Sequence, residues 1–221
     1  MPLNLVSYDA DDNGQRYFII GGAGVLTSSR SSLPVSELSS EVSFDNWYHS
    51  SYQSLDNLTV KNFLDYIQSR KDYKVINSLS EINQSGIYII DKNVRNLVID
   101  SNSVGVFNNY HLVIISLNTI TLNLNQFIPT KATAVLAETI NFSNNLIETK
   151  GIFIGKNIST GENNNQGLKI TGNLIAFSSL TNGRKWLNNR RPSLFIVFDQ
   201  SLYINLLPYL SIAYYDWQQV N

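Results

Sequence analysis

The feature that most constrains the fold is a pair of short apolar stretches that recurs along the middle of the chain. The first members of the pairs begin at residues 112, 134, 151 and 168, and the second members begin at residues 119, 139, 157 and 173. Successive members are therefore 16 to 22 residues apart in both series. A period of this size with two strands per repeat is typical of a β-solenoid, in which each coil buries its apolar side chains only by stacking on its neighbours.

The alternation of apolar and polar residues indicates which side chains point into the coil. In the stretch 119–125, isoleucine and leucine alternate with threonine and asparagine. Successive side chains of a strand point to opposite faces, so the apolar set should fill the interior. The residues expected to point inward are Ile120, Leu122, Leu124, Ile140, Phe142, Ile152, Ile154, Leu168 and Ile170.

The ends of such a coil need covering, because an open strand edge exposes unpaired backbone groups. Residues 59–70 carry the apolar stripe of an amphipathic helix, with Thr59 as its N-cap, and this helix is the expected N-terminal cap. We therefore expect a mainly β fold with three parts. A hairpin, a loop and the helical cap occupy residues 1–85, a right-handed parallel β-solenoid occupies 86–190, and an aromatic C-terminal cap occupies 191–221.

Asparagine and serine supply most of the polar surface. The chain of 221 residues contains 28 Asn and 26 Ser, has a charged fraction of 15%, and carries a net charge of −1. This balance gives no electrostatic basis for binding nucleic acid or an anionic membrane, so we expect neither partner. The chain has no cysteine, which excludes disulfides and thiolate metal sites. No stretch is long and apolar enough to span a bilayer, and no export signal is visible.

The repeats resemble those of known surface proteins. The stretches Gly151–Ile154, Asn157–Ser159 and Gly167–Ala176 look like the β-helical repeats of exported bacterial surface proteins and pilus-associated proteins. This resemblance implies a solenoid fold and an extracellular location.

The end of the chain resembles a second group of proteins. The segment from Arg191–Asp199 through Leu206–Leu210 to Trp217 is similar to the C-terminus of large surface proteins of uncultivated candidate-phylum bacteria. The likeness covers roughly residues 45–221. It implies an extracellular, structural or adhesive role, and it brings no catalytic residues with it.

A short segment near the N-terminus has the spacing of a calcium-binding loop. Asp9, Asp11 and Asn13 alternate with other residues and Gly14 follows, as at positions 1, 3, 5 and 6 of such loops. The glutamate that usually completes the loop is absent, because Ile20 occupies its position. The two interpretations are a calcium site at these three residues and an Asn-Gly hairpin turn that holds no metal.

Two aromatic clusters are candidates for ligand binding. Trp47 lies among other aromatic residues and suits stacking on a sugar ring, with packing over the core as the alternative. Arg184, Trp186 and Arg190 belong to a segment with four cations around one tryptophan. That composition suits an anionic glycan or a nucleic acid, held by charge and stacking. The alternative is a solvated loop whose arginines bond backbone carbonyls.

No set of residues indicates catalysis. Hydrolysis or elimination of a polysaccharide needs convergent carboxylates, and the nearest pair, Asp91 and Asp100, is expected at the edges of the coils. We therefore expect a non-enzymatic structural or adhesive module of an exported bacterial cell-surface protein, monomeric, with a cell-surface glycan or another surface protein as partner. The alternatives are a polysaccharide-binding or polysaccharide-degrading β-helix, a phage or viral fibre module, and a self-assembling filament subunit.

Overall fold

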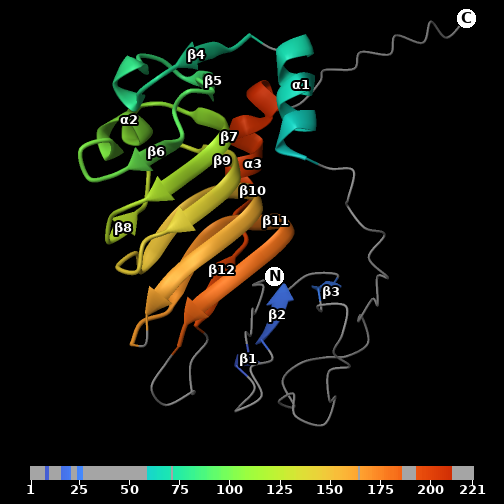
Figure 1. Ribbon diagram of the computed structural model, residues 1–221, viewed down its shortest axis with the longest axis vertical. Helices are drawn as coiled ribbons and strands as arrows, with labels where there is room; N and C mark the ends of the chain where they lie inside the picture. The colour runs from blue at the N-terminus through green and yellow to red at the C-terminus, as the bar shows by residue number, and fades with distance from the viewer. Residues whose placement is uncertain are drawn as a thin grey trace, which may run out of the picture.

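The structure is a computed structural model whose main body is a parallel β-solenoid of about four turns (Figure 1). The mainly β composition and the parallel stacking predicted from the sequence are confirmed. Three short strands form a separate antiparallel sheet, of which the backbone alone is described: β1 (Tyr8–Asp9), β2 (Arg16–Ile20) and β3 (Gly24–Leu26). The other described residues are 59–70, 72–163, 165–185 and 193–210.

Nine strands and four helical segments make up the solenoid and its surroundings. The strands are β4 (Lys74–Ile76), β5 (Gly86–Ile90), β6 (Asn96–Ile99), β7 (Leu112–Leu122), β8 (Gln126–Phe127), β9 (Thr133–Phe142), β10 (Glu148–Asn163), β11 (Leu168–Arg184) and β12 (Leu194–Val197). The helical segments are α1 (Val60–Arg70), the 3-10 helix η2 (Leu79–Glu81), α2 (Val104–Asn109) and α3 (Gln200–Leu210).

The long strands bend at corners, so one strand contributes to more than one side of the coil. Register shifts at Ser116/Thr119 and at Gly155/Asn157 mark the corner between the first two sides. We name the three sides faces A, B and C. Face A comprises residues 74–76, 86–90, 112–116, 133–137, 152–155 and 173–176, face B comprises 96–99, 119–122, 139–142, 157–159 and 179–181, and face C comprises 126–127, 148–150, 168–171 and 194–197.

The corner between faces C and A requires glycine. Gly172 has φ +133°, a conformation that L side chains rarely adopt. A Cβ atom at this position would lie 2.0 Å from the carbonyl oxygen of Gly151, its neighbour in the stack. The coils can therefore approach each other at this corner only because no side chain is present.

The interior of the coil holds one continuous apolar cluster. Ile120, Leu122, Ile140 and Phe142 belong to it, and Leu168 and Ile170 do as well, which confirms six of the expected inward positions. Leu124 packs against the same cluster. The rings of Phe142 and Phe153 meet edge to face, with centroids 5.1 Å apart.

A second apolar cluster lies on the outer side of face A. Val60, Leu64 and Ile67 of α1 pack there together with Leu202 and Leu206 of α3. Figure 1 shows both helices beside the strands. Face A is therefore buried on both sides.

The predicted helix over residues 59–70 is confirmed, but it does not cover the end of the coil. Its start is fixed by Thr59, whose Oγ1 accepts a hydrogen bond from the Asn62 N–H at 3.1 Å. The N-terminal end is closed by η2 and α2, whose Leu79 and Phe107 enter the inner cluster. The ring of Phe107 meets that of Phe127 edge to face at 4.9 Å.

The C-terminal elements do not form the cap, separate from the solenoid, that the sequence predicts. β12 pairs with residues 168–171 and is a further strand of face C. The parallel stack therefore begins with β4, before residue 86, and ends with β12, beyond residue 190. Helix α3 follows at Asp199, which accepts hydrogen bonds from the Ser201 hydroxyl and N–H and pairs with Lys150 at 3.2 Å. The hydrogen bond from the Ser201 side chain lowers the pKa of the Asp199 carboxyl below its usual value.

Two residues on face A point the opposite way from the prediction. Ile152 belongs to the outer cluster and Ile154 packs against it, whereas Phe153, between them, points into the coil. Helices cover the outer side of face A, so successive residues there are apolar on both sides. Alternation cannot show which set points inward when both sets are buried.

The first strand of the last predicted repeat lies on a different face from the one that the sequence predicts. Residues 168–170 were expected to stack on 151–154, but they pair with 194–196 and belong to face C. Residues 173–176 stack instead on 152–155 of face A. From β7 onward each coil has three strand segments instead of two, whereas the first two coils have helical segments in place of the missing strands. The first strand of face C, β8, has only two residues.

We expect Leu122→Asp to prevent stable folding. Leu122 is completely buried in the inner cluster, so an aspartate there places an unpaired carboxylate in an apolar interior. The free energy of unfolding should fall by more than about 4 kcal/mol in urea titrations. Asn123→Asp, at the adjacent exposed position, is the control and should change it by less than about 0.5 kcal/mol. Equal effects of the two substitutions would contradict the assignment of the interior.

A second expectation concerns the packing of α3 on face A. Leu206 is completely buried, whereas Ile204 in the same helix is 56% exposed. Leu206→Ala should lower the free energy of unfolding by about 3 kcal/mol, since it leaves a cavity in the outer cluster. Ile204→Ala should lower it by less than about 0.5 kcal/mol. Similar values for the two variants in thermal or urea unfolding would show that α3 does not pack on face A.

Candidate functional site

Most of the residues predicted to bind a metal or a ligand lie outside the described part of the chain. Asp9 falls in β1, where only the backbone is described. Within the described residues, no group of three or more metal-ligating side chains occurs. The calcium site and the aromatic sites stay predictions. The residues outside the described ranges are Asp11, Asn13, Trp47, Trp186 and Arg190.

Arg184 is completely buried near the C-terminal end of the solenoid. Its Nε donates a hydrogen bond to the carbonyl oxygen of Thr160 at 2.6 Å, and its Nη2 donates one to the carbonyl oxygen of Ser143 at 2.8 Å. Its Nη1 has no hydrogen-bond partner, and burial lowers the pKa of the guanidinium to about 10. The side chain therefore binds the backbone of the solenoid and does not present its charge to an external ligand.

Buried polar side chains surround this arginine. The Thr160 hydroxyl donates to Oδ1 of Asn182 at 2.7 Å, and Nδ2 of Asn182 donates to the Ser193 hydroxyl at 2.9 Å. These bonds connect two successive coils and the residue just before β12. The cluster has a structural explanation, because its hydrogen bonds hold the last described coils together.

Asp91 and Asp100 each stabilise a tight turn. The Asp91 carboxylate accepts a hydrogen bond from the Asn93 N–H at 2.8 Å. The Asp100 carboxylate accepts bonds from the N–H groups of Asn102 and Ser103 at 3.0 and 3.1 Å. Both carboxylates are thus engaged with the backbone of their own turns.

The outer side of face B is a regular array of small side chains. The inward residues of face B are apolar, so the residues on either side of them point outward. The registers of the parallel strands place these outward residues in two columns of five. We call them the face B array: Asn96, Thr119, Thr139, Asn157 and Ser179 in one column, and Val98, Thr121, Asn141, Ser159 and Thr181 in the other.

The face B array is uncharged and partly fixed by its own hydrogen bonds. The Thr121 hydroxyl donates to Oδ1 of Asn96 at 2.9 Å, and the Ser179 hydroxyl donates to Oδ1 of Asn157 at 2.8 Å. Neighbouring strands of a sheet lie about 4.8 Å apart, and alternate residues of one strand lie about 6.6 Å apart. Apart from Val98, the array therefore repeats hydroxyl and amide groups at even intervals in two directions, and all ten side chains are exposed or half-buried.

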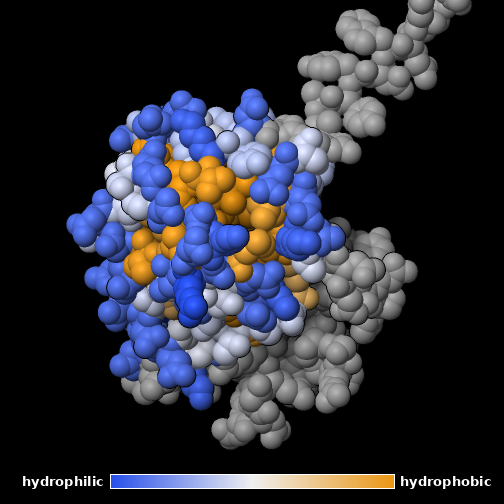
Figure 2. All heavy atoms as spheres, turned by 45° about the horizontal axis from the view of Figure 1, so that its top comes forward, coloured by the Kyte–Doolittle hydropathy of each residue, from blue (hydrophilic) through white to orange (hydrophobic). Residues whose placement is uncertain are grey.

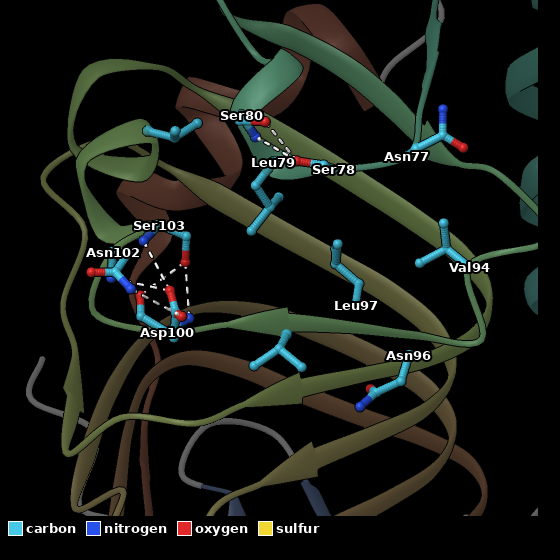
Figure 3. Close-up of a pocket in the computed structure, with 12 residues that line it drawn as sticks. Asn77, Ser78, Leu79, Ser80, Val94, Asn96, Leu97, Asp100, Asn102 and Ser103 are labelled. Carbon is cyan, nitrogen blue, oxygen red and sulfur yellow. Dashed lines mark hydrogen bonds between the residues drawn. The ribbon is translucent and has the colours of Figure 1, made fainter.

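A hollow lies at the N-terminal end of the solenoid, between residues 77–80 and β6 (Figure 3). Its volume is about 350 Å³. Leu79 and Leu97 reach toward this space from opposite sides, and Asp100 with its turn closes one end. The hollow thus has an apolar middle and a polar rim.

Neither the array nor the hollow was predicted from the sequence. The array had a usable signal, because threonine, asparagine and serine occupy the positions between the inward residues of face B. No sequence pattern indicates the hollow, because it depends on a 3-10 helix in a place where a strand would continue the stack.

Substitution of Arg184 tests its buried position. Arg184→Ala should lower the free energy of unfolding by about 3 kcal/mol, because it leaves a cavity and removes donors from two carbonyl groups. Arg184→Met fills most of the volume and removes a buried charge with no carboxylate partner among the described residues. Its loss should be about half as large. If urea unfolding shows both variants within about 0.5 kcal/mol of the parent, the side chain faces solvent instead.

Comparison with known proteins finds no match to a family model, a curated protein or a solved structure. None of the helices in the described residues has the length and apolar character needed to cross a membrane.

Proposed function

We propose that this chain is a non-catalytic adhesive module of an exported bacterial surface protein, and that the face B array is its binding surface. The ligand is a neutral polysaccharide, a polymer that presents hydroxyl groups at regular intervals. The observation that carries this proposal is the register of the array, in which nine hydroxyl or amide side chains and Val98, from five successive strand segments, form two columns.

The chemistry of the array favours an uncharged ligand. None of its ten residues is charged, so it offers no ion pair to an anionic polymer. Hydroxyl and amide groups both donate and accept hydrogen bonds, as sugar hydroxyls do. One such bond contributes only about 1 kcal/mol net, so a useful affinity requires many of them at once.

The solenoid makes many simultaneous contacts possible. The array lies on a parallel sheet whose inner side is packed, so its backbone is held in place before a ligand arrives, and two hydrogen bonds hold four of its side chains. Binding then loses less conformational freedom than binding to a loop would. The resemblance to exported surface proteins supports an extracellular setting, where polysaccharides are accessible.

Binding to insoluble polysaccharides tests this proposal. The protein is mixed with cellulose, chitin or an insoluble β-glucan, with calcium pectate as the anionic comparison, and the fraction left in solution is measured against polymer concentration. We expect the parent to bind at least one neutral polymer and not the pectate. The double variant Thr139→Lys/Asn141→Lys, in the middle of the array, should weaken that binding at least about tenfold.

The control places the same two lysines on another face. Gln126→Lys/Thr171→Lys changes outward residues of face C and should bind as the parent does. Circular dichroism and melting temperatures of both variants should match those of the parent. The proposal fails if no neutral polymer binds, or if the array variant and the face C variant bind equally.

A further inference from the structure

Within the described residues, one edge of strand β6 pairs with no other strand. The Thr119 N–H donates to the Arg95 carbonyl at 3.2 Å and the Asn123 N–H donates to the Ile99 carbonyl at 2.8 Å, so the odd-numbered residues bond β7. In a parallel ladder the residues between them direct their N–H and C=O groups to the other edge. The backbone groups of Asn96 and Val98 therefore point away from β7, and β6 pairs with no other strand of the described residues.

The edge is free because the preceding coil has no strand on face B. That coil forms β4 on face A and then turns into η2. The turn is held by a capping box, in which the Ser78 hydroxyl accepts a bond from Ser80 N–H at 3.1 Å and Glu81 Oε1 accepts one from Ser78 N–H at 3.0 Å. The backbone of η2 is thus satisfied locally, and the hollow occupies the place of the missing strand.

The surroundings of this edge suit an extended chain. Val98 is 41% exposed, and Val75 of β4, at the same end of the solenoid, is 54% exposed. Figure 2, in which the top of Figure 1 comes forward, shows apolar atoms open to view on this end of the molecule. Leu79 and Leu97, each 6% exposed, line the hollow, and serine and asparagine form part of its rim.

We propose that β6 binds an extended segment of a partner polypeptide by strand addition, with the backbone groups of Asn96 and Val98 forming the hydrogen bonds. The stack itself defines the partner's chemistry, because the added strand would continue two existing patterns. Apolar residues line the inner side of face B, and small polar residues line its outer side except at Val98. The segment therefore alternates apolar residues with threonine, serine or asparagine.

The first test uses a synthetic peptide with that pattern, the sequence of residues 119–125 with a lysine added at each end. Residues 119–122 of this sequence already form the parallel neighbour of β6 on its other edge. Amide hydrogen exchange of the whole protein is followed by nuclear magnetic resonance. Excess peptide should slow exchange at the Asn96 and Val98 N–H groups at least about tenfold. A peptide of the same composition in scrambled order should leave both rates unchanged.

The second test removes one backbone donor. Val98→Pro deletes an N–H that the β6–β7 ladder does not use, and proline is tolerated on such an edge. This variant should keep the melting temperature of the parent and lose the peptide's protection of Asn96. Val98→Ala keeps the donor and should retain that protection.

Three results of the exchange experiments would overturn the proposal. These are no protection by the alternating peptide, equal protection by the scrambled peptide, and full protection of Asn96 in Val98→Pro. Self-association in light scattering that Val98→Pro abolishes would assign the edge to a second copy of the chain and would also overturn it. The tests probe the backbone edge of β6, whereas the polysaccharide tests change side chains at 139 and 141, so either proposal can fail alone.

Discussion

Each coil of this protein depends on the parallel hydrogen-bond ladder that it shares with the coil before it. No coil is wide enough to bury its own apolar side chains, so Ile120 is covered only because Leu97 and Ile140 lie in the same column. The ladder fixes this alignment, because a shift by one residue would turn every inward side chain outward. The interior, the corners and the outer columns all follow from one register.

Face A, unlike the other two faces, also needs its outer side covered. Its outer side is apolar, and α1 and α3 cover it with Leu64 and Leu206 among their buried residues. The stacked coils would otherwise expose a wide apolar surface to water. The two helices, one before and one after the solenoid in sequence, are therefore part of the fold and not additions to its ends.

The sequence predicted the parts of the fold in which only one side of a strand is buried. On face B, alternation identified Ile120, Leu122, Ile140 and Phe142 correctly, since polar residues separate them. On face A the same reasoning failed at Ile152 and Ile154, because both sides of the strand are apolar. Face C was missed as a separate side, since its first strand has two residues and its last lies after residue 190.

The candidate sites were harder to predict than the fold. The burial of Arg184 depends on which way one residue points near the end of a long strand, and its neighbours in sequence indicated an exposed basic cluster. The face B array was present in the sequence as the polar half of an alternating pattern. Its importance appears only when the registers place five strand segments side by side.

The positions of α1 and α3 have a mechanical consequence. Both helices join the same apolar cluster on face A, although they come from opposite ends of the described chain. A pulling force that enters through either end therefore reaches a helix packed on face A before it reaches any coil. The helix must detach first, by losing apolar contacts, while the ladder of the coils stays intact. In a protein under tension, detachment of α1 or α3 would lengthen the chain while the coils keep their register.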